Sequence, residues 1–296
     1  MPQAPVFGRV LTAMVTPMNP DGSVDLEGAA RLAEHLVDNG HDGLVVNGTT
    51  GESPTTTDAE KVDLVRVVFE AVGHRARVIA GAGSNNTAHT VECARAAAKA
   101  GAHGLLIVTP YYNKPPQEGI LAHFSTVADA TDLPVIVYDI PGRTGTPIHT
   151  PTLLRMAEHP RIVAVKDAKG DLFAASEVMS QTDLLWYSGD DALNLAHLTQ
   201  GATGIVSVVG HLAGRQYAEM IAAVGQGNLA RAIEIHRQLI PVVNAVMHIT
   251  QGPIMVKAAL HDRGIIASDT LRLPLISATS DQLAHVREGI EKSGLS

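Results

Sequence analysis

The chain has 296 residues, of which 45% are hydrophobic and 18% charged, and its formal net charge is −8. These values are typical of globular proteins, and the length allows one large α/β barrel or two smaller domains. Because the balance is acidic and no basic run occurs, the composition argues against a nucleic-acid-binding surface.

Cys93 is the only cysteine, so the sequence predicts no disulfide framework and suits a reducing compartment. Residues 1–17 lack a basic stretch followed by a long apolar run, and no stretch reaches about 18 consecutive apolar residues. We therefore expect a cytoplasmic protein with no membrane partner.

Short apolar runs recur along the chain, and each is followed by a segment with helical periodicity. Strands are predicted at 9–17, 43–48, 78–83, 104–110, 134–141, 162–168, 185–190 and 204–210. Helices between them include 25–40, 58–73, 87–101 and 171–182. Residues 57–60 (TDAE) fit a capping box, and Asp171 can cap the helix that follows the sixth strand.

Alternating strands and helices imply parallel βαβ units, and eight of them predict an α/β fold of the closed (β/α)8 TIM-barrel type. A doubly wound open sheet is the alternative, but the strand exit at 81–87 (GAGSNNT) lacks the third glycine of a dinucleotide fingerprint. The residues after the eighth strand exceed one closing helix. We assign 1–224 to a barrel catalytic domain and 225–296 to a C-terminal helical extension.

Polar motifs gather where the predicted strands end, which is where barrel enzymes place their active sites. They are NGTTGES after the second strand, TPYYNKPP after the fourth, YDIPGRTG after the fifth, KDAKG after the sixth and SGDD after the seventh. Four of the five tyrosines, Tyr111, Tyr112, Tyr138 and Tyr187, lie in or beside these motifs. This clustering favours a functional hydroxyl.

Lys166 ends an apolar run that is predicted to be buried. A lysine inside a barrel mouth loses hydration, which lowers its pKa toward the neutral amine that attacks a carbonyl. Lys166 is therefore a candidate Schiff-base nucleophile. The alternative is a lysine that extends to solvent or pairs with Asp167, although strand alternation points these two side chains to opposite faces. Lys169 lies past the strand end and is expected to be solvated.

The other motifs favour a carboxylate substrate. Arg143 can bind a carboxylate with two hydrogen bonds or can be an ordinary loop arginine, and residues 48–52 (GTTGE) can bind an anion or form a plain turn. Asp190 and Asp191 disfavour phosphate, since barrels bind phosphate near this loop. Only His211 of 14 histidines lies at a strand exit and no clustered His/Cys set is visible, so metal chemistry is disfavoured. Carbonyl activation must then come from an organic group, for which Lys166 is the candidate.

These motifs together resemble the dihydrodipicolinate synthase family, and its actinobacterial members in particular, from about Val6 to the end of the chain. GTTGES, TPYYNKP, YDIPGRTG, VKDAKGD and SGDDAL occur in the family's order and approximate spacing. The resemblance implies a class I lyase that makes 4-hydroxy-tetrahydrodipicolinate from pyruvate and L-aspartate 4-semialdehyde in lysine biosynthesis, without a cofactor. It also implies a homotetramer of two tight dimers.

The resemblance assigns catalytic roles to Lys166, which forms the imine with pyruvate, and to Tyr138, which donates and accepts protons. Thr49 and Tyr112 match a proton relay, in which the tyrosine reaches across a subunit interface. The implied substrate-binding positions are Thr50 for the pyruvate carboxylate, Arg143 for the carboxylate of aspartate semialdehyde, Val206 for an apolar contact, and Gly189.

One departure from the family concerns inhibition by lysine. Many members bind lysine at a dimer-interface site in which two residues match Asn85 and Tyr111. The glutamate that pairs with the ligand's ammonium matches His89, and two histidines match Asp58 and Lys61. Because a cationic ligand loses an anionic partner and meets Lys61, weak or absent inhibition by lysine is predicted.

Three other functions remain as alternatives. N-acetylneuraminate lyase and the 2-keto-3-deoxy sugar-acid aldolases share the Lys and Tyr core, but the tandem Thr49–Thr50 and Arg143 favour the synthase. A non-catalytic metabolite-binding barrel is disfavoured because both Lys166 and Tyr138 are present. A phosphate-handling isomerase is disfavoured by SGDD.

Overall fold

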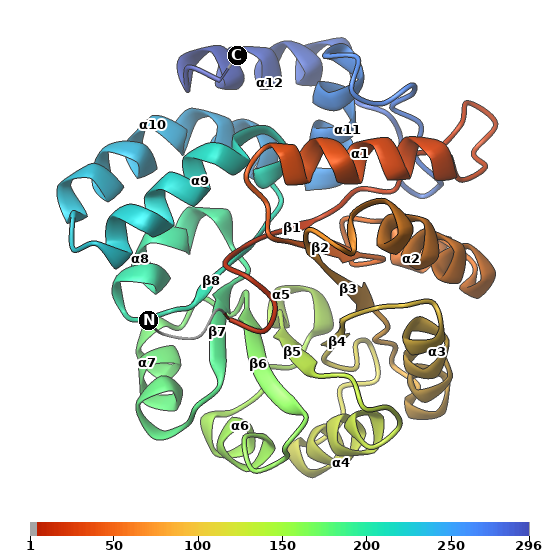
Figure 1. Ribbon diagram of the computed structural model, residues 1–296, viewed down its shortest axis with the longest axis vertical. Helices are drawn as coiled ribbons and strands as arrows, with labels where there is room; N and C mark the ends of the chain where they lie inside the picture. The colour runs from red at the N-terminus through yellow and green to blue at the C-terminus, as the bar shows by residue number, and fades with distance from the viewer. Residues whose placement is uncertain (1–4, 296) are drawn as a thin grey trace.

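The computed structural model describes residues 5–295. Its strands are parallel and form a closed barrel in chain order, with β8 paired to β1 (Figure 1). The strands are β1 Val10–Ala13, β2 Gly43–Val46, β3 Arg77–Gly81, β4 Gly104–Val108, β5 Val135–Asp139, β6 Ile162–Asp167, β7 Leu185–Ser188 and β8 Gly204–Ser207. The eight predicted strands are confirmed, and the open doubly wound sheet is wrong. Most strands end earlier than predicted, because the polar residues that follow each apolar run form the loops of the barrel mouth.

A ring of helices surrounds the barrel (Figure 1). They are α1 Leu26–Asp38, α2 Asp58–Val72, α3 Thr87–Lys99, α4 Gln117–Ala128, α6 Thr150–Met156, α7 Leu172–Gln181, α8 Asn194–Thr199 and α9 Gly210–Gly225. The predicted caps are confirmed. The Glu60 carboxylate accepts from the Thr57 N–H at 2.8 Å, the Thr57 hydroxyl accepts from the Glu60 N–H at 3.3 Å, and Asp171 accepts from the Ala174 N–H at 3.0 Å.

Alternate residues of each strand point into the barrel and fill it with side chains. This inner layer contains Leu11, Val45, Ile79, Leu106, Ile136, Ala164, Tyr187 and Val206. Tyr138 and Lys166 follow Ile136 and Ala164 by two positions, so they share the inward face but lie one step nearer the carboxyl end. They are also register partners between β5 and β6. The packed layer therefore forms the floor beneath these two polar side chains.

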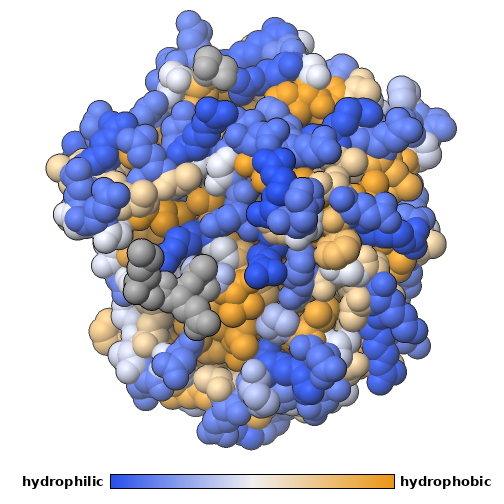
Figure 2. All heavy atoms as spheres, in the orientation of Figure 1, coloured by the Kyte–Doolittle hydropathy of each residue, from blue (hydrophilic) through white to orange (hydrophobic). Residues whose placement is uncertain are grey.

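The C-terminal extension consists of α10 Leu229–Met247, α11 Gly252–Asp262 and α12 Ser280–Lys292. Figure 1 shows these helices outside the ring, beside α1 and α9. Figure 2 shows a mostly hydrophilic rim, with apolar residues nearer the centre of the same face. Within residues 5–295 no single helix is long and apolar enough to cross a membrane, although α10 and α11 together meet that test across a bend of 107°.

Glu52 links the extension to the loop that follows β2. Its Oε1 accepts from the Lys257 Nζ at 2.5 Å, and its Oε2 accepts from the Arg272 N–H at 2.9 Å. The Lys257 Nζ also donates to the Thr270 carbonyl at 2.7 Å, and its side chain has no exposed surface. Both oxygens of a buried carboxylate near the barrel mouth are thus held by the last third of the chain.

Candidate active site

A cavity of about 900 Å³ opens at the carboxyl ends of β2 to β5. Its lining includes several predicted site residues, namely Thr49, Tyr111, Tyr112, Tyr138 and Arg143. The volume is within the range of small-molecule sites, and hydroxyl groups and a guanidinium converge on it.

Lys166 lies beside this cavity with only 5% of its surface exposed. Its Nζ is 4.0 Å from the centroid of the Tyr138 ring, and within residues 5–295 it makes no hydrogen bond or ion pair. Burial lowers the pKa of Lys166 to about 7, which the Asp191 charge opposes and the Arg143 charge supports. A substantial fraction of neutral amine is therefore present near neutral pH, as a nucleophilic lysine requires. The neighbouring Asp167 instead accepts from the Lys169 N–H at 2.7 Å.

The other buried lysine, Lys257, has a different environment. Burial lowers its pKa as well, but the Glu52 carboxylate opposes that effect and binds the ammonium directly. An ammonium held by a carboxylate and a carbonyl is not available for attack. Of the two buried lysines, only Lys166 combines burial with a free amine, and it contacts Tyr138, which lines the cavity.

Tyr138 is buried beside Lys166, and burial raises the pKa of its hydroxyl to about 12. The Arg143 charge and a hydrogen bond with the Thr49 side chain oppose this rise. The resting side chain is therefore a protonated hydroxyl that can donate a proton and take one back. The structure thus brings Lys166, Tyr138 and Thr49 together.

Tyr112 lies at the rim of the cavity with 88% of its surface exposed. Its backbone is in the left-handed region, with φ of 74°, and its N–H donates to the Thr144 carbonyl at 3.4 Å. This conformation turns the ring outward, so the single chain does not enclose it.

The loop that carries Thr49 and Thr50 is held by its own backbone. The N–H groups of Gly51, Glu52 and Ser53 donate to the Gly48 and Thr49 carbonyls at 3.0 to 3.3 Å. Within residues 5–295, the N–H groups of Thr49 and Thr50 donate to no backbone carbonyl, and the Thr50 side chain is buried. The two N–H groups and the Thr50 hydroxyl therefore remain for an anion.

The remaining predicted residues frame the lysine. A Cβ added to Gly189 would lie 3.0 Å from both Cγ and Cε of Lys166, so the absence of a side chain there makes room for the lysine. Val206 belongs to the packed inner layer. Arg143 lies on the short helix α5 Pro141–Thr144, where its guanidinium donates to the Gln251 side-chain oxygen at 2.8 Å.

Two residues that the sequence placed at the mouth have structural roles. Tyr187 is fully buried, and its hydroxyl donates to the Gly8 carbonyl at 2.8 Å, at the opposite end of the barrel. The His211 Nε2 accepts from the Val15 N–H at 3.1 Å, while its Nδ1 donates to the Val208 carbonyl at 2.7 Å. Burial lowers the pKa of His211 to about 3, so the ring is a neutral connector.

The sequence identified Asp191 only as a negative charge and did not reveal its structural role. It is buried, and its carboxylate accepts from the Ser207 hydroxyl, from the Asn194 amide at 3.0 Å, and from the Val208 and Val209 N–H groups at 2.9 and 3.0 Å. These bonds fix the loop that follows β8. Three of the four partners, Ser207, Val208 and Val209, lie 16 to 18 positions away, so a local motif does not reveal them.

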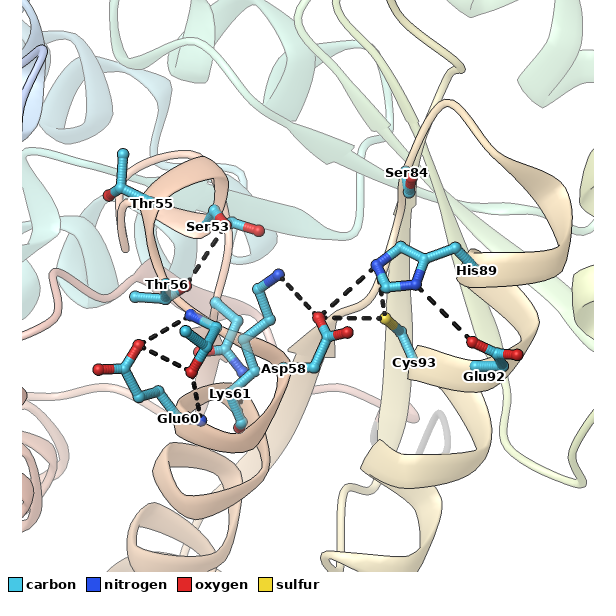
Figure 3. Close-up of polar contacts among 12 residues, drawn as sticks. Ser53, Thr55, Thr56, Asp58, Glu60, Lys61, Ser84, His89, Glu92 and Cys93 are labelled. Carbon is cyan, nitrogen blue, oxygen red and sulfur yellow. Dashed lines mark hydrogen bonds and ion pairs between the residues drawn. The ribbon is translucent and has the colours of Figure 1, made fainter.

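The structure contains a cluster of metal-ligand side chains that the sequence did not reveal. Asp58, His89 and Cys93 bring ligand-type atoms together between α2 and α3 (Figure 3). His89 and Cys93 are separated by four positions, which places them on one face of a helix. That spacing was visible in the sequence, whereas the approach of Asp58 from another helix was not.

A model of the dihydrodipicolinate synthetase family matches residues 6–293. The chain belongs to this family. A curated relative, the 4-hydroxy-tetrahydrodipicolinate synthase of the actinobacterium Kineococcus radiotolerans, is 60% identical and covers 98% of this chain and 94% of its own length.

Solved structures show the same fold. Dihydrodipicolinate synthase from Cyanidioschyzon merolae with lysine bound has a TM-score of 0.95 and 44% identity, covering 98% of this chain and 99% of its own. A monomeric dihydrodipicolinate synthase variant has a TM-score of 0.94 and 39% identity, covering 98% of both chains. The resemblance in the sequence is therefore confirmed at the level of the dihydrodipicolinate synthetase family.

Proposed function

We propose that the chain is a 4-hydroxy-tetrahydrodipicolinate synthase, which condenses pyruvate with L-aspartate 4-semialdehyde through a lysine Schiff base in lysine (diaminopimelate) biosynthesis. The observation that carries this proposal is the buried Lys166 amine, which lies 4.0 Å from the Tyr138 ring and has no ionic partner within residues 5–295. The name of the Kineococcus relative supports the same reaction.

The first half of the proposed reaction makes the imine. The neutral amine of Lys166 attacks C2 of pyruvate, and a proton moves from nitrogen to the former ketone oxygen to give a carbinolamine. Tyr138 then protonates the hydroxyl, which leaves as water and generates a protonated imine. The transient phenolate lies beside this cation, which stabilises it, and Thr49 hydrogen-bonds the same side chain.

The second half forms the carbon–carbon bond. The protonated imine is an electron sink, so C3 of pyruvate loses a proton to the Tyr138 phenolate and an enamine forms. The enamine carbon attacks the aldehyde carbon of the second substrate, whose oxygen takes up a proton. The amino group of that substrate then attacks C2, Lys166 leaves as an amine, and the ring closes. These steps use side chains alone.

Substrate binding follows from the residues around Lys166. The unused N–H groups of Thr49 and Thr50 and the Thr50 hydroxyl suit the pyruvate carboxylate, and Gly189 and Val206 leave a compact space for its methyl group. Arg143, held at the rim by Gln251, suits the carboxylate of aspartate semialdehyde. These roles are part of the proposal.

The test is incubation with pyruvate and borohydride, followed by mass spectrometry and a coupled assay with aspartate semialdehyde. A reduced pyruvyl adduct on Lys166 together with turnover supports the proposal. An adduct without turnover, and with activity toward a sugar acid, assigns the chain to a sibling aldolase instead. No adduct overturns the Schiff-base chemistry.

We also propose that the chain is a homo-oligomer, as a tetramer of two dimers. The support is that Tyr112 and Phe173 are exposed to 88% and 83%, since exposed aromatic side chains mark protein contacts. One solved relative is a monomeric variant, so sedimentation of this chain decides its oligomeric state.

A cytoplasmic location is also proposed. It rests on the single cysteine, Cys93, which suits a reducing compartment.

We propose the division of the chain near residue 224 on packing grounds. Helix α9, which ends at Gly225, packs on β1 and β8 and so completes the barrel. Helix α10 packs on α9 and α12 instead. Residues 225–296 are therefore proposed as the C-terminal helical extension.

Adduct formation is expected to depend on pH through Lys166. Because burial lowers the pKa of Lys166 to about 7, the rate constant for trapping pyruvate with cyanoborohydride should rise with pH through about 7 and then level off. Arg143→Gln removes a charge that lowers this pKa, so the midpoint of the pH profile for trapping should lie at higher pH in this variant. A wild-type midpoint near the ordinary lysine pKa of about 10.4 would contradict the buried-amine explanation.

Inhibition by lysine is expected to be weak or absent. Lys61 and His89 line the rim of the cavity, and the Lys61 Nζ lies 3.4 Å from the Asp58 carboxylate, so the acidic group is already paired. Activity at sub-millimolar lysine should match activity without lysine, and His89→Glu should increase sensitivity by restoring an anion. Half-inhibition of the wild type at sub-millimolar lysine would show that Asp58 is a sufficient partner.

A further inference from the structure

The Asp58–His89–Cys93 cluster joins three metal-ligand side chains from two helices (Figure 3). Asp58 is the first residue of α2, and His89 and Cys93 lie on one face of α3. His89 and Cys93 also line the rim of the main cavity. The proposed condensation uses none of the three.

One potential ligand atom from each of the three side chains lies close to the other two. The His89 Nε2 is 3.6 Å from the Cys93 Sγ and 3.6 Å from the Asp58 Oδ1, and the Sγ to Oδ1 distance is 3.9 Å. Tetrahedral Zn²⁺ with ordinary bond lengths needs separations of about 3.6 Å for N to S, about 3.3 Å for N to O and about 3.5 Å for S to O. The atoms therefore need to move by only a few tenths of an ångström to share one ion.

The surroundings support ligation. The His89 Nδ1 lies 3.9 Å from a carboxylate oxygen of Glu92, which is beyond hydrogen-bond distance, so Glu92 has to move closer before it accepts the Nδ1 proton and leaves Nε2 free for a metal. The Asp58 and His89 side chains are 59% and 36% exposed, so a water molecule can reach the fourth position. The Lys61 ammonium, 3.4 Å from the Asp58 Oδ1, competes with any cation for this carboxylate.

We propose that Asp58, His89 and Cys93 form a binding site for a borderline divalent cation of the Zn²⁺ class, with water as the fourth ligand. A nitrogen, a thiolate and a carboxylate suit Zn²⁺ or Co²⁺, whereas Mg²⁺ and Ca²⁺ prefer oxygen alone. Binding replaces the thiol proton with the metal and displaces Lys61 from Asp58. The site does not rest on the proposed function.

The test is titration of the full-length, chelator-treated protein with Co²⁺, followed by absorption spectroscopy. One Co²⁺ per chain should give a near-ultraviolet thiolate-to-metal charge-transfer band with tetrahedral visible bands, and Zn²⁺ should displace it. Cys93→Ser should abolish the charge-transfer band, and His89→Gln and Asp58→Asn should each weaken binding by about tenfold or more. Lys61→Met should strengthen binding, because the competing ammonium is gone.

His285→Gln provides the matched control, since it removes an exposed histidine from α12 and should leave the titration unchanged. Circular dichroism and pyruvate trapping on Lys166 verify that each variant is folded. The absence of a charge-transfer band at stoichiometric Co²⁺ would overturn the proposal. So would wild-type affinity in both His89→Gln and Asp58→Asn, because the ion would then be bound elsewhere.

Discussion

Lys166→Met is expected to abolish the borohydride-trapped pyruvate adduct and to lower kcat/KM by about four orders of magnitude or more, as loss of a covalent nucleophile does. Methionine is similar in length but cannot form an imine. It also suits the buried position, so the thermal midpoint of the variant should equal or exceed that of the wild type. Mass spectrometry of the trapped protein and the coupled assay measure the two effects.

The matched control for this variant is Lys99→Met, which replaces an exposed lysine at the end of α3 and should keep both adduct and turnover. A wild-type yield of adduct in Lys166→Met, on another lysine, would show that the nucleophile was misassigned. Lys257, the other buried lysine, would then be the first candidate for the nucleophile. We do not expect an adduct on Lys257, because its ammonium is paired with Glu52.

Glu52→Gln is expected to lower the free energy of unfolding by about 3 to 5 kcal/mol, because it leaves the Lys257 ammonium buried without a counter-charge. The pair is shielded from solvent, with side-chain exposures of 1% for Glu52 and 0% for Lys257. Urea unfolding followed by circular dichroism measures the change. The double variant Glu52→Gln/Lys257→Met should recover part of the loss, since no unpaired charge then remains.

An exposed pair offers the comparison. Glu219 and Arg231 are 2.8 Å apart at 52% and 37% exposure, and Glu219→Gln should cost about 1 kcal/mol or less. Equal losses for Glu52→Gln and Glu219→Gln would mean that the buried pair adds nothing beyond a surface contact. A Glu52→Gln variant that also loses pyruvate trapping would show that the Thr49–Thr50 loop has moved.

The features that sequence predicts well here are those that depend on local pattern. Eight apolar runs separated by helical periodicity specify the barrel, and strand alternation places Lys166 inward and Asp167 outward. Lys166 was identifiable because a charged residue ends a buried run at the functional end of the barrel.

The features that were missed depend on three-dimensional contacts. Tyr187 shares the inward face with Lys166, but its length and the nearby Gly8 carbonyl direct its hydroxyl to the other end. Asp58 meets His89 only because α2 and α3 pack side by side. The partner of Glu52 lies 205 positions away, and no spacing rule connects such residues.

The bonds that Lys257 and Arg272 make with Glu52 have a consequence for folding during protein synthesis. Strands β1 to β8 are complete by Ser207, so the ribosome has released most of the barrel long before it makes Arg272. Until then Glu52 lacks both of its partners, and only local backbone hydrogen bonds hold the loop that carries Thr49 and Thr50. We therefore expect Lys166 to be in place in the nascent chain before Glu52 is fully held, and activity to appear only near the end of translation.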